Sequence, residues 1–209
     1  MTHRLTQSIE IFIGLIQMFK PIEIFDVVDK EYQNQIYNYV TDVKFPWHFL
    51  EDTTFEKAND PHTSTPSFVN LIYHPNNESN PHVDFFMPLL NQCLDKAGFR
   101  LVNLLRMRVG FLLNTKYVFP SMPYKYNSPH RDFDQEHYTM VYYINKSDGD
   151  TVIFRELEQS EKYNVLHRST PEQGKMLMFN GWHYHSSTCP KMFTKRIALT
   201  MNFTAEQNG

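Results

Sequence analysis

The chain has 209 residues, of which 41% are hydrophobic and 15% aromatic, so it is large enough and apolar enough to fold around a core. Its formal net charge of −3 gives no bulk electrostatic reason to expect nucleic-acid or membrane partners. The two cysteines, Cys93 and Cys189, lie far apart and form no C-x-x-C motif. This excludes a cysteine zinc motif or a disulfide framework and favours a reducing, cytoplasmic location.

The first apolar segment is "IEIFIGLIQMF", residues 9–19. It is too short to span a bilayer, and Glu10 interrupts it. No small-residue cleavage site of the signal-peptide type follows it, so we expect a soluble protein.

Two helices are predicted in the first half of the chain. Residues 21–45 place apolar side chains at helical spacing after a polar start. Residues 81–99 predict a second helix that ends at Gly98. Residues 51–66 are polar and contain two prolines, which is typical of a loop.

The pattern changes after residue 100. Short segments rich in Val, Ile, Phe and Tyr alternate with Gly, Asn, Asp and Pro: "LVNLLRMRVGFLL", "YTMVYYIN", "DTVIF", "YNVLH", "GKMLMFNG" and "RIALTMNF". Such spacing predicts an antiparallel barrel or sandwich rather than a parallel α/β sheet. We therefore expect one domain over 1–209, with a helical N-terminal support region at 1–99 and a β-rich core at 100–205.

A candidate metal motif lies in "SPHRDFDQEH", residues 128–137. Residues two apart in a strand face the same side, so His130 and Asp132 would point the same way. Two histidines and one carboxylate, with three coordination positions left open, form the facial triad of non-haem Fe(II) oxygenases. Taken alone, H-x-D is a weak signal, because an exposed polar loop has the same composition.

The missing partners lie downstream. "FNGWHYHSSTCP" offers His183 and His185, which have the same strand parity, so alternation does not choose between them. Arg196 opens the last predicted strand and is suited to a two-pronged, charge-assisted hydrogen bond with a carboxylate. The order His-x-Asp, distant His and then Arg is far more specific than any one of its parts.

Together these motifs resemble the Fe(II)/2-oxoglutarate-dependent dioxygenases, especially their prolyl-4-hydroxylase-like branch. The string "HRD…YYIN…DGDTVIF…GKMLMFNGWHYHSS…RIALTMNF" carries the resemblance over about 106–203. "FPWHF" and "PSFVNLIY" upstream are similar to small phage and bacterial oxygenases, and a viral member would work in the host cytoplasm. The resemblance implies a double-stranded β-helix, or jelly roll, preceded by helices. It also implies Fe(II), 2-oxoglutarate and O2, with ascorbate as a stimulant.

Carried over residue by residue, the resemblance makes His130, Asp132 and His185 the iron ligands. Arg196 becomes the partner of the 2-oxoglutarate C5 carboxylate. The strand "VYYIN" resembles the one whose second tyrosine donates a hydrogen bond to that carboxylate, and here this tyrosine is Tyr143. Oxidative decarboxylation would then yield succinate and CO2.

The resemblance favours His185 over His183 as the third ligand. The family's ligand histidine is usually followed by a small residue, and Ser186 follows His185, whereas Tyr184 follows His183. Arg196 follows His185 by eleven positions, which fits the family's spacing better than the thirteen positions from His183.

One departure concerns the carboxylate pocket. Many relatives have Ser or Thr two residues after the arginine, but this chain has Ala198, which removes one hydrogen-bond donor and gives Tyr143 more weight. The preceding segment "NTKYVFPSMPYKYN" has no firm match. It leaves Asn114, Tyr124 and Tyr126 as candidates for the mouth of the site.

We therefore interpret the chain as a hydroxylase of C–H bonds, with peptidyl proline as the first substrate that the resemblance implies. The alternatives are a cupin-like jelly-roll module that binds a metal or ligand without turnover, and a metal-dependent hydrolase or epimerase on the same fold. The substrate is a peptide or a small molecule that the motifs do not identify.

Overall fold

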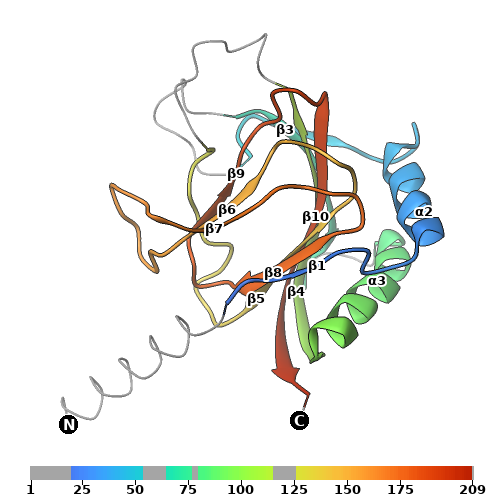
Figure 1. Ribbon diagram of the computed structural model, residues 1–209. Helices are drawn as coiled ribbons and strands as arrows, with labels where there is room; N and C mark the ends of the chain where they lie inside the picture. Colours follow the sequence, from blue (N-terminus) through green and yellow to red (C-terminus); the bar gives the residue numbers. More distant parts are fainter. Residues whose placement is uncertain (1–19, 54–64, 77–79, 115–125, 209) are drawn as a thin grey trace.

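The computed structural model of the protein describes residues 20–53, 65–76, 80–114 and 126–208 (Figure 1). The apolar segment 9–19 and most of the predicted loop 51–66 lie outside these residues. Within the described ranges, no helix is long and apolar enough to cross a membrane.

Two antiparallel sheets form the centre of the molecule. The larger has seven strands in the order β1-β8-β5-β10-β4-β3-β2, and the smaller has three in the order β7-β6-β9. The mainly β, jelly-roll prediction is therefore confirmed. The elements are β1 (Ile22–Ile24), α2 (Lys30–Thr41), β2 (His48–Leu50), β3 (Ser67–Tyr73), α3 (His82–Ala97), β4 (Phe99–Leu113), β5 (Tyr138–Tyr143), β6 (Thr151–Phe154), β7 (Val165–Ser169), β8 (Met176–Asn180), β9 (His185–Ser187) and β10 (Lys195–Gln207).

The N-terminal region is helical only in part. Helix α2 begins after Asp29, whose carboxylate accepts a hydrogen bond from the Tyr32 backbone N–H at 2.8 Å. Helix α3 ends at Gly98, as predicted, with a left-handed φ of 78° that glycine adopts without strain. Strands β1, β2 and β3 also belong to this region, and β3 pairs with β4. The described part of residues 1–99 thus extends the large sheet as well as covering it.

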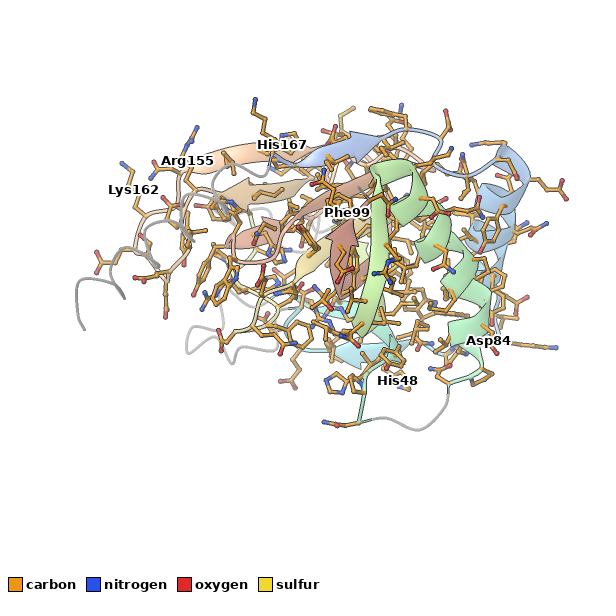
Figure 2. All side chains as sticks on the ribbon, turned by 90° about the horizontal axis from the view of Figure 1, so that it is seen from below. His48, Asp84, Phe99, Arg155, Lys162 and His167 are labelled. Atoms are coloured by element: carbon orange, nitrogen blue, oxygen red, sulfur yellow. The ribbon has the colours of Figure 1, made fainter. Side chains whose placement is uncertain are left out.

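The molecule has three layers, with the helices and the small sheet on opposite sides of the large sheet (Figure 1). Figure 2 shows the same division, with Asp84 of α3 far from Arg155 and Lys162 beyond β6. Strand alternation produces this arrangement. One face of β10 packs in the core shared with the helices, through Ile197, Leu199, Met201 and Phe203. The opposite face turns toward the small sheet, with Arg196, Ala198 and Thr200.

The small sheet is extended by the segment that carries the H-x-D motif. The backbones of His130 and His185 exchange two hydrogen bonds, of 3.0 and 2.9 Å, and Asn127 N–H donates to the Ser187 carbonyl at 2.8 Å. This segment therefore runs antiparallel to β9. Asp132 lies beyond this pairing, outside any strand. Strand alternation therefore does not explain why Asp132 faces the same side as His130. The chain bends after His130, and this bend brings Asp132 to the same place.

Candidate active site

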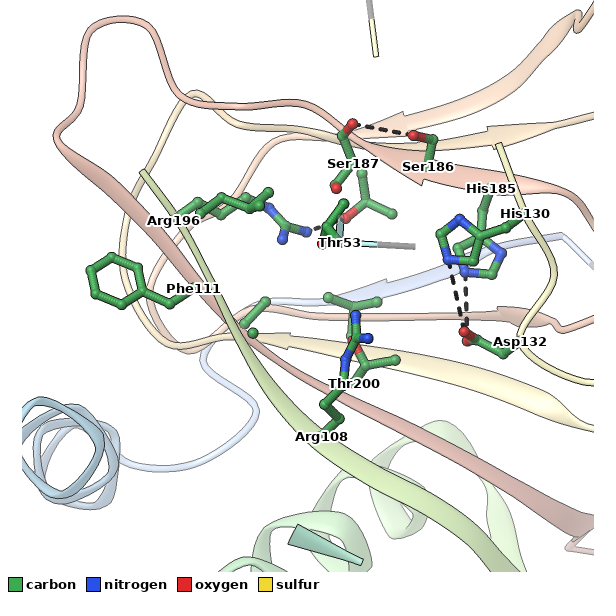
Figure 3. A pocket seen from close by; sticks show the side chains of 15 residues that line it. Thr53, Arg108, Phe111, His130, Asp132, His185, Ser186, Ser187, Arg196 and Thr200 are labelled. Atoms are coloured by element: carbon green, nitrogen blue, oxygen red, sulfur yellow. Dashed lines mark hydrogen bonds and ion pairs between the residues drawn. The ribbon is translucent and has the colours of Figure 1, made fainter. Parts of the chain in front are cut away.

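A cavity between the two sheets contains four of the predicted site residues (Figure 3). His130, Asp132 and His185 lie together at one end, and Arg196 lies at the other. The cavity therefore joins a candidate metal centre to a buried guanidinium. These are the two features that the sequence motifs placed far apart along the chain.

The two histidines present the same ring nitrogen to Asp132. His130 Nε2 lies 3.8 Å from Oδ1 of Asp132, and His185 Nε2 lies 3.5 Å from Oδ2. One possible ligand atom from each of the three residues lies within 4.8 Å of the others. The Nδ1 atoms donate to backbone carbonyls, His130 to Ser128 at 3.1 Å and His185 to His183 at 3.2 Å. These bonds orient both rings and direct each Nε2 lone pair toward the common point.

The charge states suit a divalent cation. Burial would raise the pKa of Asp132, but the adjacent Arg106 guanidinium and His185 hold it well below its usual range. Burial and the neighbouring His185 lower the pKa of His130 to about 4. At neutral pH the carboxylate is therefore ionised and this imidazole is neutral, which are the forms that bind a metal. The donor set fits a non-haem Fe(II) ion.

His183 does not join this group. It lies in the turn before β9, only 2% exposed, and its Nδ1–H donates to the Phe154 carbonyl at 2.8 Å. His183 and His185 have the same nominal parity, but the backbone between them is not a regular strand over its whole length. The structure therefore brings His185, and not His183, to His130 and Asp132.

Two residues that the sequence analysis missed hold the Asp132 carboxylate. Arg106 forms an ion pair with its Oδ1, and the Asn202 side-chain amide donates to its Oδ2 at 2.8 Å. Arg106 Nε also donates to the Asn202 side-chain oxygen at 3.0 Å. A carboxylate oxygen has a second lone pair, so both contacts are compatible with metal binding. Two features of the sequence could have indicated these residues. Asn202 lies on the same face of the last strand as Arg196, and Arg106 is one of two arginines in an otherwise apolar strand.

The far end of the cavity is built around Thr151. Its hydroxyl oxygen accepts hydrogen bonds of 2.9 Å from Arg196 Nη2 and from the Tyr143 hydroxyl. Arg196 is only 7% exposed, and burial lowers its pKa from the ordinary value. Tyr143 is fully buried and lies behind Thr151 rather than on the cavity wall.

Thr151 also bears on the missing donor at Ala198. The Thr151 hydroxyl lines the cavity beside Arg196 and keeps its own hydrogen to donate while accepting two bonds. Strand β6 therefore places a hydroxyl beside Arg196, while position 198 of β10 is an alanine. This contact could not be predicted from local pattern, because Thr151 and Arg196 are 45 residues apart.

Two of the three predicted mouth residues, Asn114 and Tyr126, lie in the described part of the chain. The Asn114 side-chain amide donates to the Lys191 and Phe193 carbonyls, both at 2.9 Å, so it fastens the turn before β10. Asn114 is not among the described residues that line the cavity, and its place at the mouth of the site stays a prediction. The Tyr126 ring packs on Phe154, with centroids 4.9 Å apart. Tyr124 lies outside the described residues.

Of the comparisons with known proteins, the one with solved structures finds similar folds. No model of a known protein family matches the chain, and no curated protein matches it in sequence. Among solved structures, a 2OG-Fe(II) oxygenase family oxidoreductase from Burkholderia pseudomallei is similar, with a TM-score of 0.62, 14% identity and coverage of 90% of this chain and 87% of that one. The non-haem, α-ketoglutarate-dependent epimerase SnoN from nogalamycin biosynthesis gives a TM-score of 0.60 at 9% identity, over 98% and 87%. A Pseudomonas putida prolyl-4-hydroxylase gives 0.53 at 11%, over 94% and 97%.

The chain therefore has the fold of the 2-oxoglutarate- and Fe(II)-dependent oxygenases. At these identities the likeness concerns the fold alone, so activity has to be argued from the site.

Proposed function

We propose that this protein is an Fe(II)- and 2-oxoglutarate-dependent dioxygenase that hydroxylates a C–H bond and releases succinate and CO2. The observation that carries the proposal is the cavity with His130, Asp132 and His185 at one end and Arg196 at the other. The fold shared with oxygenases that use this cofactor and co-substrate supports it.

The side chains of this protein bind and orient the reactants. His130, Asp132 and His185 would hold Fe(II), which supplies the redox chemistry with O2 when bound. Arg196 would take the C5 carboxylate of 2-oxoglutarate in a two-pronged hydrogen bond, and the Thr151 hydroxyl would add a third donor. No proton transfer by Arg196 is needed, because its guanidinium stays charged and acts by positioning the co-substrate.

The first candidate substrate is a peptidyl proline, because a prolyl-4-hydroxylase is among the similar structures. A small molecule is equally compatible with the fold, since SnoN is an epimerase from nogalamycin biosynthesis. The prime substrate is therefore a peptide or a small molecule.

The activity is tested by succinate formation from 2-oxoglutarate with Fe(II), O2 and ascorbate, with and without a peptide and metabolite library. We expect succinate in the wild type and a matching mass increase of one oxygen atom in one library member. Binding of metal and 2-oxoglutarate with no succinate under any condition would instead support a cupin-like binding module.

Tyr143→Phe is expected to weaken 2-oxoglutarate binding moderately. The change removes the hydrogen bond to Thr151, which would cost about 0.5–1.5 kcal/mol, or roughly 2- to 10-fold in Kd. Calorimetry on Mn(II)-loaded protein measures it. Tyr142→Phe is the matched control, because Tyr142 is equally buried but belongs to the core shared with the helices. Equal affinities in both variants would show that Tyr143 only fills space.

Asn202→Ala is expected to lower metal affinity by roughly 10- to 100-fold, the usual effect of removing a group that orients a metal ligand. The cause is the loss of the 2.8 Å hydrogen bond to Asp132 Oδ2. Mn(II) titration followed by paramagnetic resonance measures free metal. Asn103→Ala, an exposed change on β4, is the control. Unchanged affinity in Asn202→Ala would mean that Arg106 alone positions Asp132.

A further inference from the structure

The proposed function depends on one long side chain that crosses from the large sheet toward the small one. Arg196 enters the cavity from its far end, and its guanidinium reaches the Thr151 hydroxyl (Figure 3). An arginine side chain has several rotatable bonds, and their freedom is lost when the guanidinium has to hold a ligand at one place. A distal carboxylate is therefore bound well only if the protein fixes Arg196 before the ligand arrives.

The loop of residues 145–150, between β5 and β6, holds the backbone on both sides of Arg196. The Asn145 side-chain amide donates to the Lys195 carbonyl at 3.1 Å, and its oxygen accepts from the Ile197 N–H at 2.7 Å. Asn145 follows β5, so its side chain continues the pairing with β10 past the end of that strand. These two bonds fix the direction in which the Arg196 side chain leaves the backbone.

The same loop fixes the turn that leads into β10. The Asp148 carboxylate accepts hydrogen bonds from three successive backbone N–H groups, at distances between 2.9 and 3.2 Å. The donors are Lys191, Met192 and Phe193. Hydrogen bonds to an ionised carboxylate are stronger than those between neutral groups, so the turn is firmly attached to the loop.

Gly149 lets the loop approach the arginine side chain itself. It is buried, and a Cβ added there would lie 2.9 Å from Arg196 Cδ and 2.6 Å from the Thr188 carbonyl oxygen. Atoms this close force a neighbour to move. The Thr188 backbone is held by its own N–H, which donates to the Asp150 carbonyl at 2.9 Å. The flexible Arg196 side chain is therefore the neighbour that would yield, and glycine leaves the room that this side chain occupies.

The loop acts on a bound molecule indirectly. Asn145, Asp148 and Gly149 are not among the described residues that line the cavity, whereas Arg196 is. We infer that the loop of residues 145–150 positions Arg196 and so gives the site its preference for a 2-oxo acid with a distal carboxylate. The inference rests on the proposed function and deepens it by naming the positioning residues of the co-substrate site.

The test compares 2-oxoglutarate with 2-oxopentanoate, which has the same metal-chelating end and the same chain length but no C5 carboxylate. The full chain, loaded with Mn(II), is titrated with each acid by calorimetry. We expect the wild type to prefer 2-oxoglutarate and Gly149→Ala to lose roughly 10-fold or more of that preference, because a misplacement of about 1 Å can cost roughly 100-fold. The affinity for 2-oxopentanoate should change little, since this acid does not use Arg196.

Further variants separate positioning from an effect on folding. Asn145→Ala and Asp148→Ala should lower the preference in the same direction, and Asp148→Asn should keep part of it, because its amide oxygen still accepts from the turn. Lys146→Ala is the matched control. Lys146 is an exposed residue of the same loop whose ammonium pairs with Glu172 at 2.9 Å. Melting temperature and Mn(II) affinity establish which variants are folded, and Asn145→Ala decides the question if Gly149→Ala is not.

A wild-type preference in the folded loop variants overturns the inference, as does an equal loss in Lys146→Ala. So does a loop variant that binds both acids more weakly by the same factor, because Arg196 would then not be the residue affected. The proposed function stands in each of these cases. A wild type that binds neither acid, or that binds both equally, removes the proposed role of Arg196 together with the inference.

Discussion

His185→Ala is expected to abolish stoichiometric binding of Fe(II) or Mn(II), whereas His183→Ala is expected to keep it. His185 Nε2 lies 3.5 Å from Asp132 Oδ2, and its removal leaves a cation with only His130 and Asp132. His183 instead donates to the Phe154 carbonyl, so its loss affects packing of the turn before β9. Metal content of the two purified proteins, after dialysis against trace metal, measures the difference.

Each of these variants is the control for the other, because both remove a buried imidazole from the same turn and strand. Circular dichroism and melting temperature establish that both are folded. Metal lost from His183→Ala and retained by His185→Ala would reverse the assignment that sequence spacing and geometry both favour.

Arg196→Leu is expected to weaken 2-oxoglutarate binding by about 2–5 kcal/mol, the cost of truncating one partner of a buried, hydrogen-bonded charge pair. This corresponds to a rise in Kd of roughly 30-fold to several thousand-fold. Arg196 is 7% exposed and holds Thr151 at 2.9 Å, so the leucine variant loses the charge and the alignment of that hydroxyl together. Mn(II) affinity should stay near that of the wild type, because Arg196 is at the other end of the cavity.

Calorimetric titration of Mn(II)-loaded protein with 2-oxoglutarate measures this effect. Lys195→Leu is the matched control, since Lys195 is the preceding residue of β10 and its ammonium lies over the Tyr37 ring, 5.3 Å from the centroid. Arg196→Lys should bind with intermediate affinity, because an ammonium keeps the charge and loses the two-pronged geometry. If Arg196→Leu keeps the wild-type affinity, another cation of the cavity has to bind the C5 carboxylate of 2-oxoglutarate. Arg108 is the first residue to test for that role.

Much of the architecture could be predicted from local pattern. The alternation in "RIALTMNF" places Arg196 and Ala198 on one face of β10 and Ile197 and Leu199 on the other, and the structure has this division. Gly98 ends α3 because a left-handed residue is needed there. Short β-rich segments separated by turn residues predicted two antiparallel sheets. Each of these features depends on neighbours in the chain, so the sequence alone determines them.

The same holds for the identity of the candidate site residues. His130, Asp132, His185 and Arg196 were chosen from residue type, order and spacing, and the structure brings all four to one cavity. Their roles as iron ligands and carboxylate partner stay predictions for the variants above to test. Strands β1, β2 and β3 were missed. β1 and β2 have only three residues each, and the pairing of β1 with β8 depends on a partner far along the chain.

Only the tertiary structure decided how these residues are held. Asp132 lies outside any strand, so its place beside His130 comes from Arg106 and Asn202, which are distant in sequence. Thr151 meets Arg196 because β6 and β10 belong to different sheets that face each other across the cavity. The physical reason is that backbone periodicity is a local property, whereas the hydrogen-bond partners of a buried polar group are whatever the packed sheets place within about 3 Å of it.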